Sequence, residues 1–167
     1  MANHAPRPPL YTPEQRRRRD QTRWTLVQGV LAPVQFLAFG VSVVLVVRTL
    51  LTGEAEALAH ASVVIKTGLL YAIMVTGAIW EKRVFGRYLF APAFYWEDVF
   101  SMLVLALHTA YLAALATGWL GTRALLLLAL AAYATYVINA GQFVLKLRAA
   151  RLDAARLDGA RLDGARL

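Results

Sequence analysis

The sequence contains no cysteine, which excludes disulfides, iron–sulfur clusters and thiolate chemistry. Acidic residues are scarce as well, with 10 aspartates and glutamates against 18 lysines and arginines in a chain of 167 residues. Long stretches carry no charge, and 59% of the residues are hydrophobic, which is too apolar for a soluble domain of this length. The basic residues cluster in the tails and between apolar runs, a pattern that indicates membrane topology rather than nucleic-acid binding.

Four apolar runs follow one another, at residues 24–47, 58–80, 99–122 and 124–145. Each is long enough to cross a bilayer, whose hydrocarbon core takes about 20 helical residues. The first run is too long for the hydrophobic region of a signal peptide, so we expect it to be retained. Pro33 should kink this run or mark an interfacial first turn. The predicted fold is an all-α membrane protein, a bundle of four transmembrane helices.

The distribution of basic residues predicts the orientation of this bundle. If both chain ends are on the inner side, 15 lysines and arginines lie there, and only Arg48 and Arg123 lie outside. Lys66 falls inside the second run, where it either snorkels to the near interface or faces a cavity. Because basic residues collect on the cytoplasmic side of membrane proteins, we expect both termini in the cytoplasm.

Polar segments flank the expected membrane domain at 24–148. Residues 1–23 hold four prolines and a run of arginines at 16–19, which we interpret as a disordered start followed by a positive flank of the first helix. Lipid-headgroup or nucleic-acid binding is the alternative for these arginines. Residues 149–167 repeat the unit RLDAA or RLDGA. A five-residue leucine period matches no helix face, so we predict a solvated, frayed, low-complexity tail.

The connector at 81–98 is the candidate site, because it combines acids, arginines and aromatic rings next to membrane-spanning helices. Its aromatic residues suit the headgroup zone, and Pro92 prevents one continuous helix. We therefore predict an interfacial, partly helical segment lying on the membrane. Asp98, at its end, should cap the third helix or sit in its first turn.

These residue types suit a large, flat, apolar molecule that carries a carboxylate. The rings of Tyr88, Tyr95 and Trp96 would pack against its faces. Its acid group would pair with Arg83 or Arg87. The three carboxyl groups of the connector would then be available for proton transfer, and Glu97 is preferred as the acid because Asp98 is the better placed helix cap. The three are Glu81, Glu97 and Asp98.

Two further polar features lie inside the expected helices. His108 shares a helix face with Glu97, about 16 Å away along the axis. It is a core histidine bonded to a neighbour, an axial ligand to a chelated metal, or a proton relay. No second metal ligand has a suitable spacing, so no protein-bound metal is expected. The fourth run carries a polar stripe that either joins helices or contacts a ligand, formed by Thr135, Asn139, Gln142 and Lys146.

At these residues the chain resembles the 3-vinyl bacteriochlorophyllide hydratases of bacteriochlorophyll synthesis, whose older name is 2-vinyl. The resemblance extends over nearly everything between Tyr11 and Leu152, and the pentad tail lies beyond it. The matching segments are YTPEQR from Tyr11, WTLVQG from Trp24, YAIMVTGAIWEK from Tyr71, VFGRYLFAPAFYWEDVFSMLVLALHTAYLAAL from Val84 and YATYVINAGQFVLKLRAARL from Tyr133.

The resemblance implies addition of water to the C3 vinyl group of a chlorophyllide, giving a 1-hydroxyethyl group. It implies a planar, magnesium-bearing tetrapyrrole substrate that ends in a propionate, and no cofactor. The axial-ligand alternative for His108, which comes from the residues themselves, would then apply to the magnesium of this substrate. The expected location is a bacterial inner membrane, either cytoplasmic or photosynthetic intracytoplasmic. Lipid surrounds the chain there, other pigment-synthesis enzymes or further copies of the chain are candidate partners, and no nucleic acid is expected.

Two other functions fit parts of the pattern. A non-catalytic pigment-binding or assembly protein needs only His108 as a magnesium ligand, with the carboxyl groups acting as helix caps. A small transporter would use Lys66 and the polar stripes as a pathway. It requires a continuous polar pore, which the third apolar run does not provide.

Overall fold

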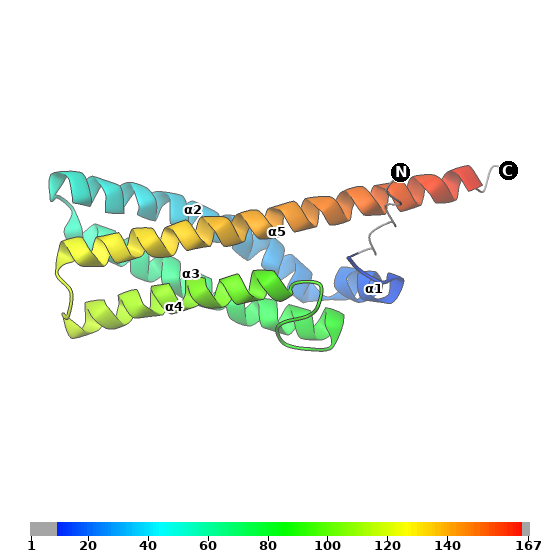
Figure 1. Ribbon diagram of the computed structural model, residues 1–167, viewed down its shortest axis with the longest axis horizontal. Helices are drawn as coiled ribbons and strands as arrows, with labels where there is room; N and C mark the ends of the chain where they lie inside the picture. Colours follow the sequence, from blue (N-terminus) through cyan, green and yellow to red (C-terminus); the bar gives the residue numbers. More distant parts are fainter. Residues whose placement is uncertain (1–9, 165–167) are drawn as a thin grey trace, which may run out of the picture.

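The computed structural model describes residues 10–164, which form five α-helices with no β-strand among them. They are α1 (Pro13–Gln21), α2 (Arg23–Thr52), α3 (Glu56–Phe85), α4 (Tyr95–Thr117) and α5 (Thr122–Gly164). Helices α2 to α5 are each long and apolar enough to cross a membrane. They run along one common long axis in Figure 1, which confirms the predicted bundle of four membrane-spanning helices.

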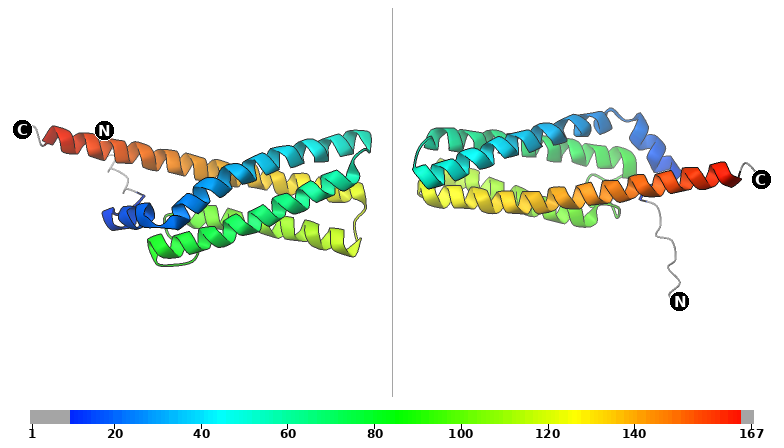
Figure 2. Two further views of the ribbon diagram at one scale, coloured as in Figure 1. Left: turned by 180° about the vertical axis from the view of Figure 1, so that it is seen from behind. Right: turned by 90° about the horizontal axis from the view of Figure 1, so that it is seen from above.

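The four long helices pack as two antiparallel hairpins. Helix α2 packs mainly against α3, and α4 packs mainly against α5, with fewer contacts between the two hairpins. The α2–α3 and α4–α5 turns lie together at one end of the bundle, called the turn end below (Figures 1 and 2). Helix α1 and the α3–α4 connector lie at the other end, called the connector end.

The inside of the bundle is more polar than its outer surface. On α2, Leu37 and Val44 are exposed, whereas Ser42 is buried. The Ser42 hydroxyl lies 2.6 Å from that of Tyr133 and 2.7 Å from that of Ser62, so it joins α2 to both α5 and α3. A membrane protein gains nothing by hiding apolar side chains from lipid, so polar contacts and close packing hold its helices together.

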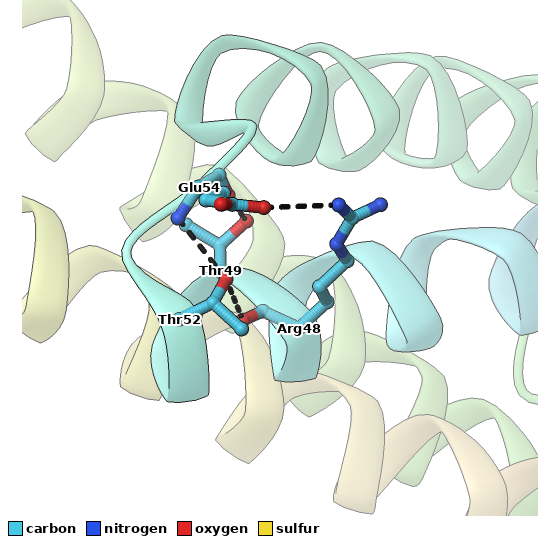
Figure 3. A network of polar contacts seen from close by, with 4 residues as sticks. All are labelled: Arg48, Thr49, Thr52 and Glu54. Carbon is cyan, nitrogen blue, oxygen red and sulfur yellow. Dashed lines mark hydrogen bonds and ion pairs between the residues drawn. The ribbon is translucent and has the colours of Figure 1, made fainter.

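The turn between α2 and α3 is short and densely hydrogen-bonded (Figure 3). The Glu54 carboxylate accepts from the Arg48 guanidinium at 3.0 Å, and its backbone carbonyl accepts from the Thr49 hydroxyl at 2.8 Å. Its backbone N–H donates to the Thr52 hydroxyl at 3.1 Å. Only residues 53–55 separate the two helices. The turn is therefore shorter than the segment that separates the first two apolar runs of the sequence.

Charged residues that were expected in the central connector lie inside helices instead. Helix α3 continues to Phe85 and α4 begins at Tyr95, so the connector covers residues 86–94 and the predicted segment at 81–98 was too long. Gly86, with φ of 87°, ends α3 in a left-handed conformation that glycine adopts without strain. Pro33 lies well inside α2, so it does not mark a first turn.

The two flanking segments are more helical than the sequence predicted. Helix α1 starts with a capping box, in which the Thr12 hydroxyl accepts from the Gln15 N–H and the Gln15 side chain accepts from the Thr12 N–H. Helix α5 extends past the other helices and continues to Gly164, so a frayed backbone is wrong up to that residue (Figure 2). The disorder expected at 1–9 lies outside the described residues, and the division at 23 and 148 stays a prediction.

Four crossings put both chain ends on the same side of the membrane, which single cysteines can test without background labelling because the chain has none. Glu54→Cys lies at the turn end and Arg87→Cys at the connector end. We expect a membrane-impermeant maleimide to label these two variants from opposite sides of the membrane. Labelling of both from the same side would contradict a four-crossing bundle.

Candidate active site

Two carboxyl groups meet at the connector end of the bundle. Glu81 comes from the last turns of α3 and Asp98 from the first turn of α4, and both carboxyl groups accept from the connector, from the N–H groups of Ala91 and Phe90. The residues are only 5% and 3% exposed. Two negative charges that are close together and away from water repel each other, so such a pair favours holding one proton. The pair is suited to hold a single proton away from water.

The connector supplies two backbone donors to this pair. The Phe90 N–H donates to Asp98 Oδ2 at 2.8 Å, and the Ala91 N–H donates to Glu81 Oε2 at 3.3 Å. Phe90 has φ of 58°, a left-handed conformation that is uncommon for a residue other than glycine. Successive N–H groups next to a left-handed residue converge on an acceptor, which explains how one short turn reaches both carboxyl groups.

Asp98 lies in the first turn of α4 and does not cap the helix, so the first-turn alternative of the sequence prediction is confirmed. The N-cap residue is Phe94, which makes no capping bond through its side chain. Asp98 lies one turn further along the helix, where its carboxyl group faces the connector and Glu81. The capping argument for preferring Glu97 as the acid therefore no longer holds.

Glu97, the neighbour of Asp98, points toward α5. Its Oε2 accepts from Lys146 Nζ at 2.6 Å, and the two side chains are 10% and 26% exposed. One turn further into the bundle, the Asn139 amide donates to the Ser101 hydroxyl at 2.8 Å. Two members of the predicted polar stripe thus face α4. The ion pair makes Glu97 a hydrogen-bond acceptor, in contrast to the carboxyl pair beside it.

A buried aromatic cluster lies at the same end of the molecule. Its centre is Phe94, whose ring centroid is 5.8 Å from those of Trp80, Phe85 and Phe143. Tyr11 stacks on Phe85 at 5.8 Å, and its burial raises the pKa of its hydroxyl. The cluster joins the start of the chain to α3, the connector and α5, so it fixes the backbone around the carboxyl pair.

The predicted substrate-binding residues of the connector region lie on the surface of the connector end. Tyr88, Tyr95 and Trp96 are 61%, 47% and 66% exposed. The rings of Phe90, Tyr95 and Trp96 form a row, called the aromatic patch below, with centroid separations of 5.8 and 5.4 Å. Tyr88 instead lies 5.3 Å from the Lys82 amine. Two arginines are exposed at this end, Arg83 and Arg87, and the second donates to the Phe90 carbonyl at 3.4 Å.

His108 is fully buried in the middle of the bundle and bonds through both ring nitrogens. Its Nε2 lies 2.6 Å from Lys66 Nζ, and its Nδ1 lies 2.7 Å from the Val104 carbonyl. Because a carbonyl only accepts, Nδ1 carries the proton and Nε2 accepts from Lys66. Lys66 is fully buried beside the Tyr136 ring, so snorkelling to the interface is wrong. Coordination of a magnesium by His108 would require Lys66 to move away.

Sequence reasoning missed four contacts of the site. They are the ion pair of Glu97 with Lys146, the bond of Lys66 to His108, and the two backbone donors of the connector. The ion pair could have been predicted, since Glu97 and Lys146 lie at the same end of two consecutive expected helices. The backbone donors had none, because nothing in the sequence marks Phe90 as left-handed.

Comparison with known proteins identifies the family. A family model described as 2-vinyl bacteriochlorophyllide hydratase matches residues 11–149. The chain belongs to this family. A 2-vinyl bacteriochlorophyllide hydratase of Cereibacter sphaeroides is 69% identical over 150 residues, which are 89% of this chain and 92% of that protein. A protein of the same name from Rhodobacter capsulatus is 70% identical over 144 residues, 86% of this chain and 84% of that protein. No solved structure matches the chain.

Membership of the 2-vinyl bacteriochlorophyllide hydratase family confirms the resemblance seen in the sequence. The matched range includes the carboxyl pair, the aromatic patch and the part of α5 that carries Asn139 and Lys146. It ends before the RLDGA repeats. Hydratase chemistry needs a proton donor and a water molecule whose proton is removed, and the connector end offers carboxyl groups in two different environments for these tasks.

Proposed function

We propose that this hydratase adds water to the C3 vinyl group of a chlorophyllide-type tetrapyrrole, and that the Glu81–Asp98 pair supplies the proton. As a member of the family, the chain is a hydro-lyase of bacteriochlorophyll biosynthesis. The proton bonds to the terminal vinyl carbon and leaves a cation at the inner carbon, delocalised into the macrocycle. Water bonds to the inner carbon and loses a proton, which yields a 1-hydroxyethyl group.

The observation that carries this proposal is that the buried Glu81 and Asp98 carboxyl groups accept from successive backbone N–H groups of the connector, so that one short turn holds both of them. A general acid must hold a proton until the substrate arrives, and a shared proton between two buried carboxyl groups meets that requirement. Donation adds one negative charge to the pair, and this charge stabilises the cation that forms beside it. The N–H groups of Phe90 and Ala91 already point at the two carboxyl groups and stabilise that charge as well.

The aromatic patch supports a binding place for the macrocycle next to this acid. Tyr95 precedes Asp98 by three residues and lies on the same side of α4. The Phe90 ring is tilted against that of Tyr95, and its backbone N–H donates to Asp98. A planar ring resting on the patch would bring a small substituent such as a vinyl group toward Asp98. Arg87, which bonds to the Phe90 carbonyl, is the preferred partner of the propionate, and Arg83 is the alternative.

We also propose a bacterial inner membrane, with both termini and the connector on the cytoplasmic side. The connector carries or adjoins Lys82, Arg83 and Arg87, and α5 carries Lys146 and Arg148 at the same end of the bundle. The turn end has only Arg48 and Arg123. This asymmetry supports the orientation because basic residues are retained on the cytoplasmic side during insertion.

The experiment that tests the activity is direct. Membranes that contain the full chain are incubated with a 3-vinyl chlorophyllide, and the pigments are analysed by mass spectrometry. We expect a product heavier than the substrate by one water, and oxygen-18 in that product when the incubation is done in labelled water. Membranes without the chain are the control. Recovery of unchanged pigment from membranes that hold the inserted, folded chain would show that it does not act on this substrate class.

A further inference from the structure

A polar cluster between α4 and α5 contains two buried oxygen atoms without partners. The cluster consists of Glu97 and Ser101 on α4, and of Asn139, Gln142 and Lys146 on α5, helices that lie side by side (Figure 1). Asn139 is 8% exposed and its amide donates to Ser101. Its Oδ1 and the Oε1 of Gln142 are buried and accept no hydrogen bond from any residue within 10–164.

Helix geometry puts these two oxygen atoms on one side of α5. Asn139, Gln142 and Lys146 follow at steps of three and four, which return to the same helix face. Lys146 on that face already bonds to Glu97, and Asn139 bonds to Ser101 one turn away. Gln142 therefore lies on the α5 face that makes both contacts with α4, and its oxygen is buried.

A small hydrogen-bond donor is the ligand that fits this cluster. Buried polar groups without protein partners commonly bind an ordered water molecule, which donates two hydrogen bonds and accepts others. Water also suits the site if the side-chain amide of either residue is flipped, because water can accept a hydrogen bond from the amide nitrogen instead. The reaction of this family consumes water, so a bound water here is a substrate next to the proposed acid.

We propose that Asn139 and Gln142 hold the water molecule that adds to the vinyl group, and that Glu97 removes its proton. This inference rests on the proposed function. Glu97 suits a base because its ion pair with Lys146 leaves its second oxygen as an acceptor. Asp98 is its neighbour in the chain, and Lys146 bonds to Glu97 at the same end of α4. The acid Asp98 and the base Glu97 are thus adjacent residues of α4, and the vinyl group of the substrate lies between them.

The proton balance closes with these residues alone. The Glu81–Asp98 pair gives one proton to the terminal vinyl carbon, whose double bond supplies the electron pair. The water oxygen bonds to the inner carbon, and one water proton passes to the Glu97 carboxylate. A transfer from Glu97 back to Asp98, directly or through solvent, restores both groups for the next turnover.

Deuterium exchange separates the two halves of this reaction. In heavy water, the acid adds deuterium to the terminal carbon, and a cation that is not captured by water loses hydrogen or deuterium to become a vinyl group again. A protein with a working acid but a defective water site therefore returns vinyl pigment that contains deuterium. A protein with a defective acid returns unlabelled vinyl pigment.

The main variant is Gln142→Met, which keeps the length of the side chain and removes its oxygen. We expect hydration to fall at least about tenfold, with deuterium still entering the recovered vinyl pigment of the full-length protein. General-base contributions of about 10²–10⁴-fold predict a larger loss for Glu97→Gln, also with exchange retained. Gln28→Met is the matched control: it removes an amide that bonds to Thr76 on α3, and hydration should stay at the wild-type rate.

Asn139→Leu is the second water-site variant, and circular dichroism and gel filtration verify that each variant is folded. Hydration at the wild-type rate in both Gln142→Met and Asn139→Leu would overturn the inference. Parallel loss of hydration and exchange in these variants would overturn it too, because the residues would then support the acid or the binding of pigment. If the wild-type chain gives neither product nor exchange, the proposed function itself fails, which is a different result.

Discussion

Asp98→Asn should lower the hydration of a 3-vinyl pigment by about 10²–10⁴-fold, the range typical for loss of a general acid. Asparagine has the size of aspartate and keeps an oxygen that can accept from the Phe90 N–H, so the connector should retain its conformation. It has no carboxyl proton to share with Glu81 or to give to the vinyl group. Turnover is measured as hydrated pigment by mass spectrometry, and pigment binding by titration of the absorption spectrum, which should be unchanged.

Two further variants make this result specific to the carboxyl pair. Glu81→Gln should cause a loss of the same order, because the shared proton requires both groups. Glu54→Gln is the matched control at the turn end, where an exposed carboxylate bonds to Arg48, and it should leave turnover unchanged. If Asp98→Asn and Glu81→Gln both hydrate pigment normally, the acid lies elsewhere. If Glu97→Gln were the only variant that lost deuterium exchange at the vinyl group, Glu97 would be the general acid.

The bundle was predictable because lipid imposes a simple rule on the sequence. Each apolar run of about 20 residues or more, including the second run with its single Lys66, had to become a helix that satisfies its own backbone. The ends of those helices were harder to predict, since α3 and α4 continue through charged and aromatic residues to Phe85 and from Tyr95. Such residues suit both a helix end at the membrane surface and an interfacial loop, and composition does not distinguish the two.

The sequence predicted which residues belong to the candidate site, but not which of them contact one another. Helical spacing placed Glu97 and Ser101 on one face of α4, and Asn139 and Lys146 on one face of α5, and the structure shows that these faces meet. Spacing says nothing about how one helix is rotated toward another, so the ion pair with Lys146 was not foreseen. The position of Asp98 beside Glu81 depends on the left-handed conformation of Phe90, whose N–H donates to Asp98. Conformational preferences do not predict a left-handed phenylalanine.

The hydrogen bond between Lys66 and His108 should matter for stability rather than for the chemical step. His108→Leu leaves the Lys66 amine buried without its acceptor, and Lys66→Met leaves His108 Nε2 without its donor. An orphaned buried polar group costs about 1–3 kcal/mol, so each single variant should lose roughly that much free energy of unfolding. Reversible unfolding in detergent micelles, followed by circular dichroism during a denaturant titration, measures the loss.

The double variant Lys66→Met with His108→Leu decides between a structural bond and a magnesium ligand. Replacing both partners by apolar groups of similar size removes the orphaned group, so stability should recover toward the wild type. Because both ring nitrogens of His108 are engaged within the bundle, the double variant should also bind and hydrate pigment like the wild-type protein. A folded double variant that has lost pigment binding would show instead that Lys66 moves aside and His108 coordinates the magnesium. That outcome would extend the binding place from the aromatic patch at the connector end to the middle of the membrane.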